Sequence, residues 1–545
     1  MLINYNLLIF AIIIKLSYQF KILVYNPVFG TSHSNHMIKI AEFLAENGHD
    51  VTIIHAPMNP KTNDNHGKKA RVIRPSTYDK KVKDIFEIVD KNLKDVWNIN
   101  SLWNPYYTLT LISMFNKWLA ASCEHIIKDD ELTKLMRNEN FDLGIGEAFV
   151  PCVFGMFKYY NITKHVAVMS GIPIDSHYNE MGIDFPIGRV PSIFAPISEN
   201  MSFLERIYNT MFYLTSKYIH KEGVYRGNDV FNQYAPSYNI NLENIFNECV
   251  FYISNTDPII NFGVPGSPKM LQLGGFLLKQ PKPLDSFFDE LLNKRERNVI
   301  ISFGSFAKSM HMPKEGRNNL VELFKLFPNI TFIFKYEIED PIFFKNFENV
   351  VTKTWLPLYD LLNDKRVSVF IMHGGMNSLL EGSRAGVPML GIPLFYDQPR
   401  NVKVIGELKL GRWMDKTQFI NNKNLFINNF KDVLGNPLYK KSVKKVSEMI
   451  KKRPYNEQEL FLKYIEFACE FGQIKNFNIG NKKASFSNQH SMIDIYLFTL
   501  FTFYVITCGI FLLLKHVYLI LVQIYQLILK KDKNNLKDKF KEKQQ

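Results

Sequence analysis

Cysteine and tryptophan are scarce in this chain, with five of each among 545 residues. The cysteines lie far apart and form no Cys-x-x-Cys pair, which excludes a disulfide-rich scaffold and disfavours a cysteine-based metal site. Four of them, Cys123, Cys152, Cys249 and Cys469, lie outside the long apolar run that contains Cys508. The sequence leaves their pairing open.

A clustered basic face with interleaved aromatic residues is also missing, although the formal net charge is +14. Nucleic-acid binding would require such a cluster. Seven lysines stand instead near the C-terminus, between Lys530 and Lys543. A solvated surface and this basic tail explain the charge, so we expect no nucleic-acid partner.

The N-terminus carries an apolar run, Leu7 to Ile14, that is too short to cross a bilayer. Polar residues from Ser17 to Gln19 follow it. This pattern predicts a cleaved signal peptide over residues 1–19. Because a single core stops growing well below 545 residues, two domains of about 200 residues each are expected after it.

Near the C-terminus, Ile495 to Leu514 contains no charged residue and has the length of a membrane-crossing helix. We predict a transmembrane helix over 493–514, ended by Lys515 and His516. The apolar stretch Val517 to Leu529 is expected to lie along the interface as an amphipathic helix. By the positive-inside tendency, the lysine-rich tail 515–545 is cytosolic and the body is lumenal.

Strand and helix patterns alternate along the body, which predicts an α/β fold. Residues 20–265 form the first expected domain and open with a strand, Lys21 to Tyr25. A linker is expected over 266–296, where glycine and proline gather. A second α/β domain is expected over 297–450, and closing helices and a juxtamembrane segment over 451–490.

The run from His373 to Val402 is typical of a nucleotide site. A buried strand before it, Val367 to Met372, leads through Gly374 and Gly375 into a short helix. The free N–H groups of that helix N-terminus suit a diphosphate, and Glu381, one turn inside, suits ribose hydroxyls. Asp397 and Gln398 follow the next strand, where α/β sheets bind ligands.

These motifs closely resemble the signature of the UDP-glycosyltransferases, membrane-bound enzymes that move a sugar from a UDP-sugar to a small lipophilic acceptor. The resemblance implies the GT-B fold, in which two facing Rossmann-like domains enclose a cleft, here with one C-terminal transmembrane helix. It extends from about Phe20 to Leu514 and is strongest in the second domain. The matching residues are Trp355-Leu356-Pro357, His373-Gly374-Gly375, Asn377, Glu381, Gly386-Val387-Pro388, Gly391-Ile392-Pro393 and Asp397-Gln398.

The resemblance also implies the roles of individual residues. His33, in Gly30-Thr31-Ser32-His33, would be the catalytic base. Its orienting partner would be Glu147, where the family commonly has Asp, while Asp142 would be structural. The donor would be held by Ser305, Trp355, His373, Gly375, Asn377, Ser378, Glu381, Asp397 and Gln398. A leucine, Leu358, replaces the usual glutamine after the Trp-x-Pro motif.

No metal is expected at this site. His36 shares a helix face with His33, but no third ligand has a characteristic spacing. The chain also lacks the Asp-x-Asp pair with which metal-dependent sugar transferases hold a cation. The UDP-sugar is therefore a co-substrate and no cofactor is predicted.

The predicted function is inverting transfer of a hexosyl or hexuronosyl group, glucosidation or glucuronidation, to a lipophilic hydroxyl such as that of a lipid, sterol or foreign phenol. Aromatic residues in Asn98 to Trp118 and Tyr208 to Tyr225 predict a greasy acceptor pocket. The alternative is a catalytically impaired, membrane-anchored UDP-sugar-binding protein, which Leu358 and Glu147 would favour. A soluble nucleotide-sugar epimerase does not explain the signal peptide and the span.

The expected location is the endoplasmic reticulum membrane, as a single-pass type I protein. Lys541-Glu542-Lys543-Gln544-Gln545 resembles a retrieval signal. Sequons at Asn161, Asn200 and Asn329 fit a lumenal glycoprotein. The donor sugar, the acceptor and the state of association, with a homo-oligomer possible, stay open.

Overall fold

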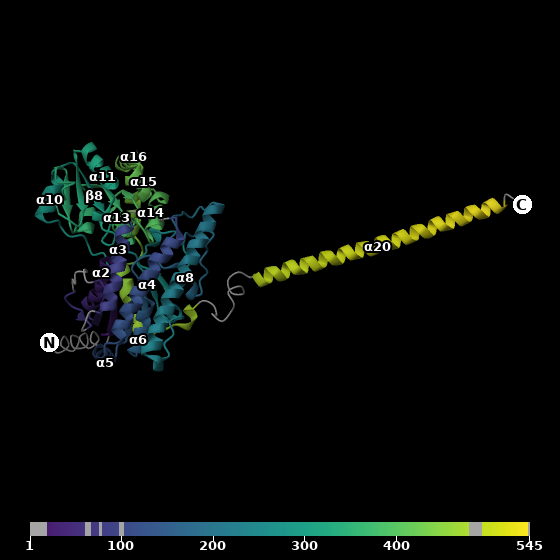
Figure 1. The fold of residues 1–545 in the computed structure, drawn as a ribbon, viewed down its shortest axis with the longest axis horizontal. Coiled ribbons are helices and arrows are strands. Elements are labelled where there is room, and N and C mark those ends of the chain that lie inside the picture. Colours follow the sequence, from purple (N-terminus) through teal and green to yellow (C-terminus); the bar gives the residue numbers. More distant parts are fainter. Residues whose placement is uncertain are drawn as a thin grey trace, which may run out of the picture. The chain divides into compact units, whose positions relative to one another are not determined.

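A computed structural model describes residues 19–59, 67–75, 79–97, 103–339, 341–478 and 493–542. The chain divides into a body, Met1–Ile479, and a second unit, Gly480–Gln545. Figure 1 draws both units. The predicted signal peptide and the last three residues of the retrieval signal lie outside the described residues.

The first half of the body is built on a seven-stranded parallel sheet with the order β3-β2-β1-β4-β5-β6-β7. Every residue of β1 after Lys21 is buried. Such continuous burial is typical of a parallel strand that helices cover on both faces. The strands are β1 (Lys21–Val28), β2 (Asp50–Pro57), β3 (Arg71–Ile73), β4 (Leu143–Glu147), β5 (His165–Met169), β6 (Tyr252–Ser254) and β7 (Met270–Gln272).

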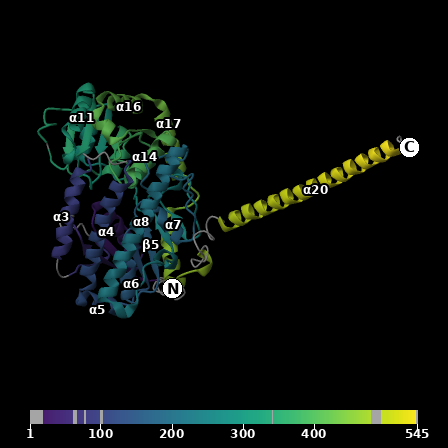
Figure 2. The same cartoon turned by 45° about the vertical axis from the view of Figure 1, so that its right-hand side comes forward.

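The helices of this half include two long ones, α4 and α8, which run side by side (Figure 2). A disulfide between Cys123 and Cys152 joins α4 to α6, which closes the pairing question for these two cysteines. The helices are α2 (Thr31–Glu46), α3 (Lys80–Asp95), α4 (Pro105–Ile127), α5 (Asp130–Asn138), α6 (Pro151–Tyr159), α7 (Asp175–Glu180), α8 (Phe203–Tyr234) and α9 (Ile245–Glu248).

The second half has a six-stranded parallel sheet with the order β10-β9-β8-β11-β12-β13. Its strands are β8 (Arg297–Ser302), β9 (Ile330–Lys335), β10 (Val350–Lys353), β11 (Val367–Met372), β12 (Met389–Gly391) and β13 (Gly411–Trp413). Its helices are α10 (Ser286–Asn293), α11 (Lys314–Leu326), α12 (Leu358–Leu362), α13 (Met376–Ala385), α14 (Gln398–Glu407), α15 (Lys416–Asn421), α16 (Lys423–Gly435) and α17 (Pro437–Lys451).

The two sheets confirm the predicted α/β class. The segment expected as the linker, 266–296, contains strand β7 and helix α10. β7 pairs with β6 and completes the first sheet. Three-residue strands carry too little alternation or apolar sequence to be distinguished from a loop in advance.

Helix α18 (Glu457–Phe471) returns the chain to the first half. Its residues Phe461, Ile465 and Ala468 are fully buried in the core beside β1 and α2, and Phe461 stacks on Phe276 with ring centroids 4.4 Å apart. Just before it, Arg453 forms a buried ion pair with Asp257. The end of the second half is therefore fastened across the first sheet.

The second unit contains helix α20 (Ile493–Glu542), which is continuous where the sequence predicted an end at Lys515 and His516. Within it, Ile495–Lys531 is long and apolar enough to cross a membrane. At 1.5 Å per residue this stretch exceeds the roughly 30 Å of hydrocarbon in a bilayer. Two polar residues do not by themselves terminate a helix, so α20 continues through Lys515 and His516.

Removing the Phe461 ring tests the fastening of α18. We expect Phe461→Ala to lower the free energy of unfolding by about 3–5 kcal/mol, because a large ring leaves a cavity in a close-packed core. Phe471→Ala is the control, since that ring is 60% exposed. Thermal unfolding of the two detergent-solubilised variants measures the difference, and equal losses would contradict the packing.

Candidate active site

His33 lies at the mouth of a cavity that both halves of the body line. It is the third residue of α2, which begins after the extended Gly30 at the carboxyl end of β1. Its ring contacts Phe29 at a centroid distance of 4.6 Å, and its side chain is 27% exposed. The strand-to-helix turn therefore presents an accessible imidazole to the cavity.

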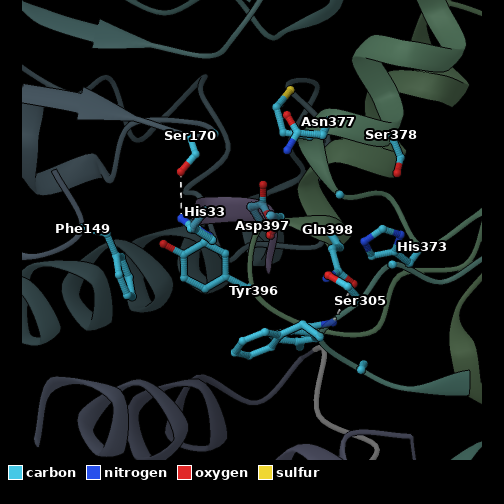
Figure 3. A pocket seen from close by; sticks show the side chains of 18 of the residues that line it. His33, Phe149, Ser170, Ser305, His373, Asn377, Ser378, Tyr396, Asp397 and Gln398 are labelled. Carbon is cyan, nitrogen blue, oxygen red and sulfur yellow. Dashed lines mark hydrogen bonds between the residues drawn. The ribbon is translucent and has the colours of Figure 1, made fainter. Parts of the chain in front are cut away.

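Glu147 and Ser170 complete a hydrogen-bonded chain behind His33. They stand at the carboxyl ends of the neighbouring parallel strands β4 and β5. Ser170 Oγ lies 2.8 Å from His33 Nδ1 and donates to Glu147 Oε2 at 2.5 Å, and Ser170 N donates to Glu147 Oε1 at 3.1 Å. Figure 3 shows Ser170 pointing at His33.

The hydrogen bonds from His33 through Ser170 to Glu147 determine which ring nitrogen of His33 is protonated. Ser170 has one hydroxyl proton, and the short bond to the Glu147 carboxylate uses it. Ser170 Oγ then accepts from His33 Nδ1–H, so His33 Nε2 carries the lone pair. Glu147 Oε2 itself is 3.5 Å from Nδ1, and it acts on the ring mainly through Ser170.

Glu147 is completely buried. Burial raises the pKa of its carboxyl, but the hydrogen bond and charge of His33, with smaller contributions from His36 and Ser170, bring the pKa below its usual value. The carboxylate is therefore ionised at neutral pH. Asp142 has a structural role, as predicted, because it accepts from the Lys21 amide at 2.8 Å.

His36 packs at the edge of the Phe276 ring, 5.8 Å between centroids. Burial, more than the charges around it, lowers its pKa to about 4. Within the described ranges no three His, Cys, Asp or Glu side chains are grouped as metal ligands.

The second half contributes a glycine-lined loop between β11 and α13. Gly374 has φ +86°, a left-handed conformation that favours glycine, and Gly375 is the N-cap of α13. A Cβ on Gly375 would lie 2.6 Å from His373 Nε2, and one on Gly304 would lie 2.7 Å from the same atom. The His373 ring thus fits only because Gly304 and Gly375 lack a side chain.

Burial, followed by the charge of Lys335, lowers the pKa of His373 to about 4. The ring is therefore neutral at physiological pH and can act only as a hydrogen-bonding group. Ser305, Asn377 and Ser378 line this cavity and a second one beside it, so they stand where the two compartments join.

The second cavity contains the residues predicted to hold the nucleoside. Trp355, 60% exposed, lies there with Glu381 and with Leu358, the departure from the family pattern. Burial raises the pKa of Glu381 to about 7. Leu358 is the first residue of α12 and lines the cavity without a polar side-chain atom.

Asp397 and Gln398 line the first cavity from the N-terminus of α14. Tyr396 before them has φ +61°, a strained conformation for a residue with a side chain and one that is common at functional sites. Gln398 Oε1 accepts from the amides of Leu394 and Phe395 at 2.9 and 3.2 Å. The side-chain nitrogen of Gln398, Nε2, is then left to donate a hydrogen bond to a ligand.

Sequence reasoning missed two polar residues of the site. Ser170 is one of them. The other is Asn255, whose Nδ2 donates to Asn377 Oδ1 at 2.8 Å and to Ser170 O at 3.3 Å. Both directly follow buried strands, and polar residues at strand ends were the signal that could have identified them.

The remainder of the first cavity is apolar and aromatic. Helix α4 contributes to it, as predicted from residues 98–118, but no lining residue comes from 208–225. That prediction was wrong, because Tyr208, Tyr218 and Tyr225 lie on the exposed face of α8. The apolar lining residues are Phe29, Leu111, Ile112, Phe115, Phe149, Met169, Ile172, Phe303, Phe306, Ala307, Met376, Phe395 and Tyr396.

Comparison with known proteins agrees with this geometry. The model of the family "UDP-glucoronosyl and UDP-glucosyl transferase" matches residues 21–531. The Caenorhabditis briggsae protein ugt-47 is 26% identical over 488 residues, 87% of this chain and 88% of its own. The Xenopus laevis "UDP-glucuronosyltransferase 3A1" is 26% identical over 478 residues, 86% of this chain and 88% of its own.

A solved structure shares the fold. The "Glycotransferase of kitacinnamycin" has a TM-score of 0.55 at 13% identity and covers 82% of this chain and 99% of its own. The chain therefore has the GT-B fold, with two parallel α/β sheets. The chain belongs to the UDP-glucuronosyl and UDP-glucosyl transferase family and transfers sugar from a UDP-sugar co-substrate.

The fit of His373 between two glycines can be tested with one methyl group. Gly375→Ala should weaken UDP binding at least about 10-fold, since the backbone φ of −62° suits alanine but the methyl would meet the imidazole. Calorimetric titration with UDP measures the change. Gly266→Ala, a position with open space around it, should bind as the wild type does; equal weakening in both would refute the fit.

Proposed function

We propose that the enzyme transfers a hexosyl or hexuronosyl group, with inversion, from a UDP-sugar to the hydroxyl of a small lipophilic acceptor, and that His33 is the general base. The observation that supports this is the chain from His33 through Ser170 to the buried Glu147, which lies across one cavity from the N-terminus of α13. The aromatic remainder of the cavity suits a lipophilic acceptor.

In this reaction His33 Nε2 removes the acceptor proton while the acceptor oxygen forms a bond to the anomeric carbon. The bond between that carbon and the β-phosphate oxygen breaks, and UDP leaves with the electron pair. The imidazolium that forms is stabilised through Ser170 by the Glu147 carboxylate. A single displacement at the carbon inverts its configuration.

The departing diphosphate is held by backbone N–H groups at the first turn of α13 and by the Ser305 hydroxyl. Asn377 and Ser378 stand in that turn. These donors can stabilise the leaving charge without a cation, so we propose a metal-independent reaction. Transfer is expected to continue at its full rate in EDTA, and a rate restored only by Mg²⁺ or Mn²⁺ would contradict it.

We further propose that the body lies in the lumen of the endoplasmic reticulum. The disulfide between Cys123 and Cys152 fits an oxidising compartment. The sequon residues Asn161, Asn200 and Asn329 are all exposed, as glycosylation requires. Removal of N-glycans from the expressed protein by an endoglycosidase should reduce its apparent mass, and an unchanged mass would argue against this location.

The role of His33 and its partners can be tested with a double-mutant cycle. His33→Ala should lower kcat about 10²–10⁴-fold with UDP affinity unchanged, because only the proton transfer is lost. Ser170→Ala and Glu147→Gln should each lower kcat, and the double variant should be no slower than the slower single variant, since both residues act on His33 through one hydrogen-bonded chain.

The assay uses detergent-solubilised full-length protein, a panel of UDP-sugars and a lipophilic phenol. Full transfer by His33→Ala would overturn the assignment of His33 as the base. If the losses in kcat from Ser170→Ala and Glu147→Gln add up in the double variant, the two residues do not act on His33 through one series of hydrogen bonds. Measurable UDP binding without transfer from any donor would favour a catalytically impaired binding protein.

A further inference from the structure

We propose that Trp97, in the first half, is a positioning residue for the diphosphate site of the second half. It acts through the loop that carries Ser305, the serine whose hydroxyl would hold the departing diphosphate. The inference rests on the proposed function, because it concerns a group that would stabilise the leaving UDP.

Ser305 belongs to a loop, residues 303–308, between β8 and the short helix Ser309–His311. Near its start, Gly304 N donates to Ser302 Oγ over a long 3.5 Å. Within the described part of the chain, no hydrogen bond between backbone groups holds residues 303–307. Their amides are therefore available to an anion, but the shape of the loop has to come from side-chain packing.

Trp97 holds both ends of this loop. Its ring contacts the Phe303 ring edge-on, with centroids 5.2 Å apart and planes at 77°. Its Nε1 donates to Lys308 O at 2.9 Å. The indole is 1% exposed, and a hydrogen bond away from water is strengthened. Because Phe303 and Lys308 are the first and last residues of the loop, one indole fixes the distance between its ends.

The backbone just before Trp97 is fastened to the same half. Val96 O accepts from Lys416 Nζ at 2.5 Å, and the same ammonium group donates to Leu394 O at 3.2 Å. Lys416 is completely buried. Moving Val96 away would remove one partner of a buried ammonium group, which is costly. The end of α3 therefore keeps its place against the second half.

The middle of the loop is held by the side of the first half that lines the cavity of His33. Phe306 packs on Phe115 of α4, with centroids 5.7 Å apart and planes at 30°. Both rings line that cavity. A Cβ on Gly30 would lie 3.0 Å from Phe306 Cε2, so the turn before α2 also approaches the loop closely. The first half thus shapes the loop that carries Ser305.

This packing should affect the diphosphate more than the nucleoside. A loop that has the binding geometry for only part of the time lowers the affinity of its ligand by that fraction. Trp97 therefore raises the affinity for UDP through Ser305. Trp355 and Glu381, which would hold the nucleoside, line the second cavity and lie outside the loop.

The experiment compares two tryptophans that are equally buried. Trp97→Phe and Trp118→Phe each shorten an aromatic side chain that is 1% exposed. Trp118 Nε1, however, has no hydrogen-bond partner among the described residues, and its ring contacts Phe86 and Phe115 in the first half. Calorimetric titration of the solubilised full-length variants measures UDP binding, and competition against UDP measures the binding of uridine, which has no phosphate.

We expect Trp97→Phe to weaken UDP binding about 5-fold, as the loss of one buried hydrogen bond would. Uridine should bind this variant as it binds the wild type, and Trp118→Phe should leave both affinities unchanged. Unchanged UDP binding in Trp97→Phe, or equal weakening of UDP and uridine, would overturn the proposal. Equal weakening would mean that Trp97 only stabilises the fold.

A double-variant cycle assigns the effect to Ser305. Ser305→Ala should weaken UDP binding, and adding Trp97→Phe should weaken it little further, since both residues act on one contact. Losses that add up would refute the action through Ser305.

Binding separates this proposal from the proposed function, because it is measured without turnover. Selective loss of UDP affinity in Trp97→Phe supports the role of Trp97 even if the wild type transfers no sugar. An effect of Ser305→Ala without one of Trp97→Phe would overturn the role of Trp97 alone.

Discussion

The hydrogen bond from Ser170 to the buried Glu147 is the interaction on which the chemistry of this site depends. It exists because β4 and β5 are adjacent parallel strands, so that the residues at their carboxyl ends meet at one edge of the sheet. The Glu147 carboxylate accepts a hydrogen bond from the Ser170 hydroxyl, and the serine oxygen then accepts one from His33. A bond inside the first half therefore decides which nitrogen of His33 is exposed to a substrate.

The site also requires that the two halves keep a defined separation. Several buried side chains bridge them, and each is satisfied by partners from the other half. Arg400 and Asn255 do so beside the cleft. Farther away, Lys416 donates to Val96 O at 2.5 Å, and Trp97 Nε1 donates to Lys308 O at 2.9 Å. Losing one such partner would leave a buried polar group unpaired, which is costly.

Sequence patterns were enough to predict the features of this structure that depend on short stretches of sequence. His33 at a strand-to-helix turn, the glycine loop before α13, and the aspartate and glutamine at the start of α14 all come from short runs with one plausible geometry.

The remaining features depend on contacts between distant segments. Ser170 is 137 residues from His33 and 23 from Glu147, so only the strand order brings the three together. The fit of His373 between Gly304 and Gly375 depends on the same kind of juxtaposition. The exposed aromatics of α8 were misassigned to the acceptor pocket because composition reports how apolar a segment is and not which side of it is buried.

The most direct test of this account is the protonation of the His33 ring in the UDP-bound enzyme. Nitrogen-15 NMR of histidine-labelled protein distinguishes the two tautomers, and a His33→Gln spectrum identifies its signals among the 13 histidines. The account predicts that neutral His33 carries its proton on Nδ1 and leaves Nε2 bare. A proton on Nε2 with a bare Nδ1 would contradict it.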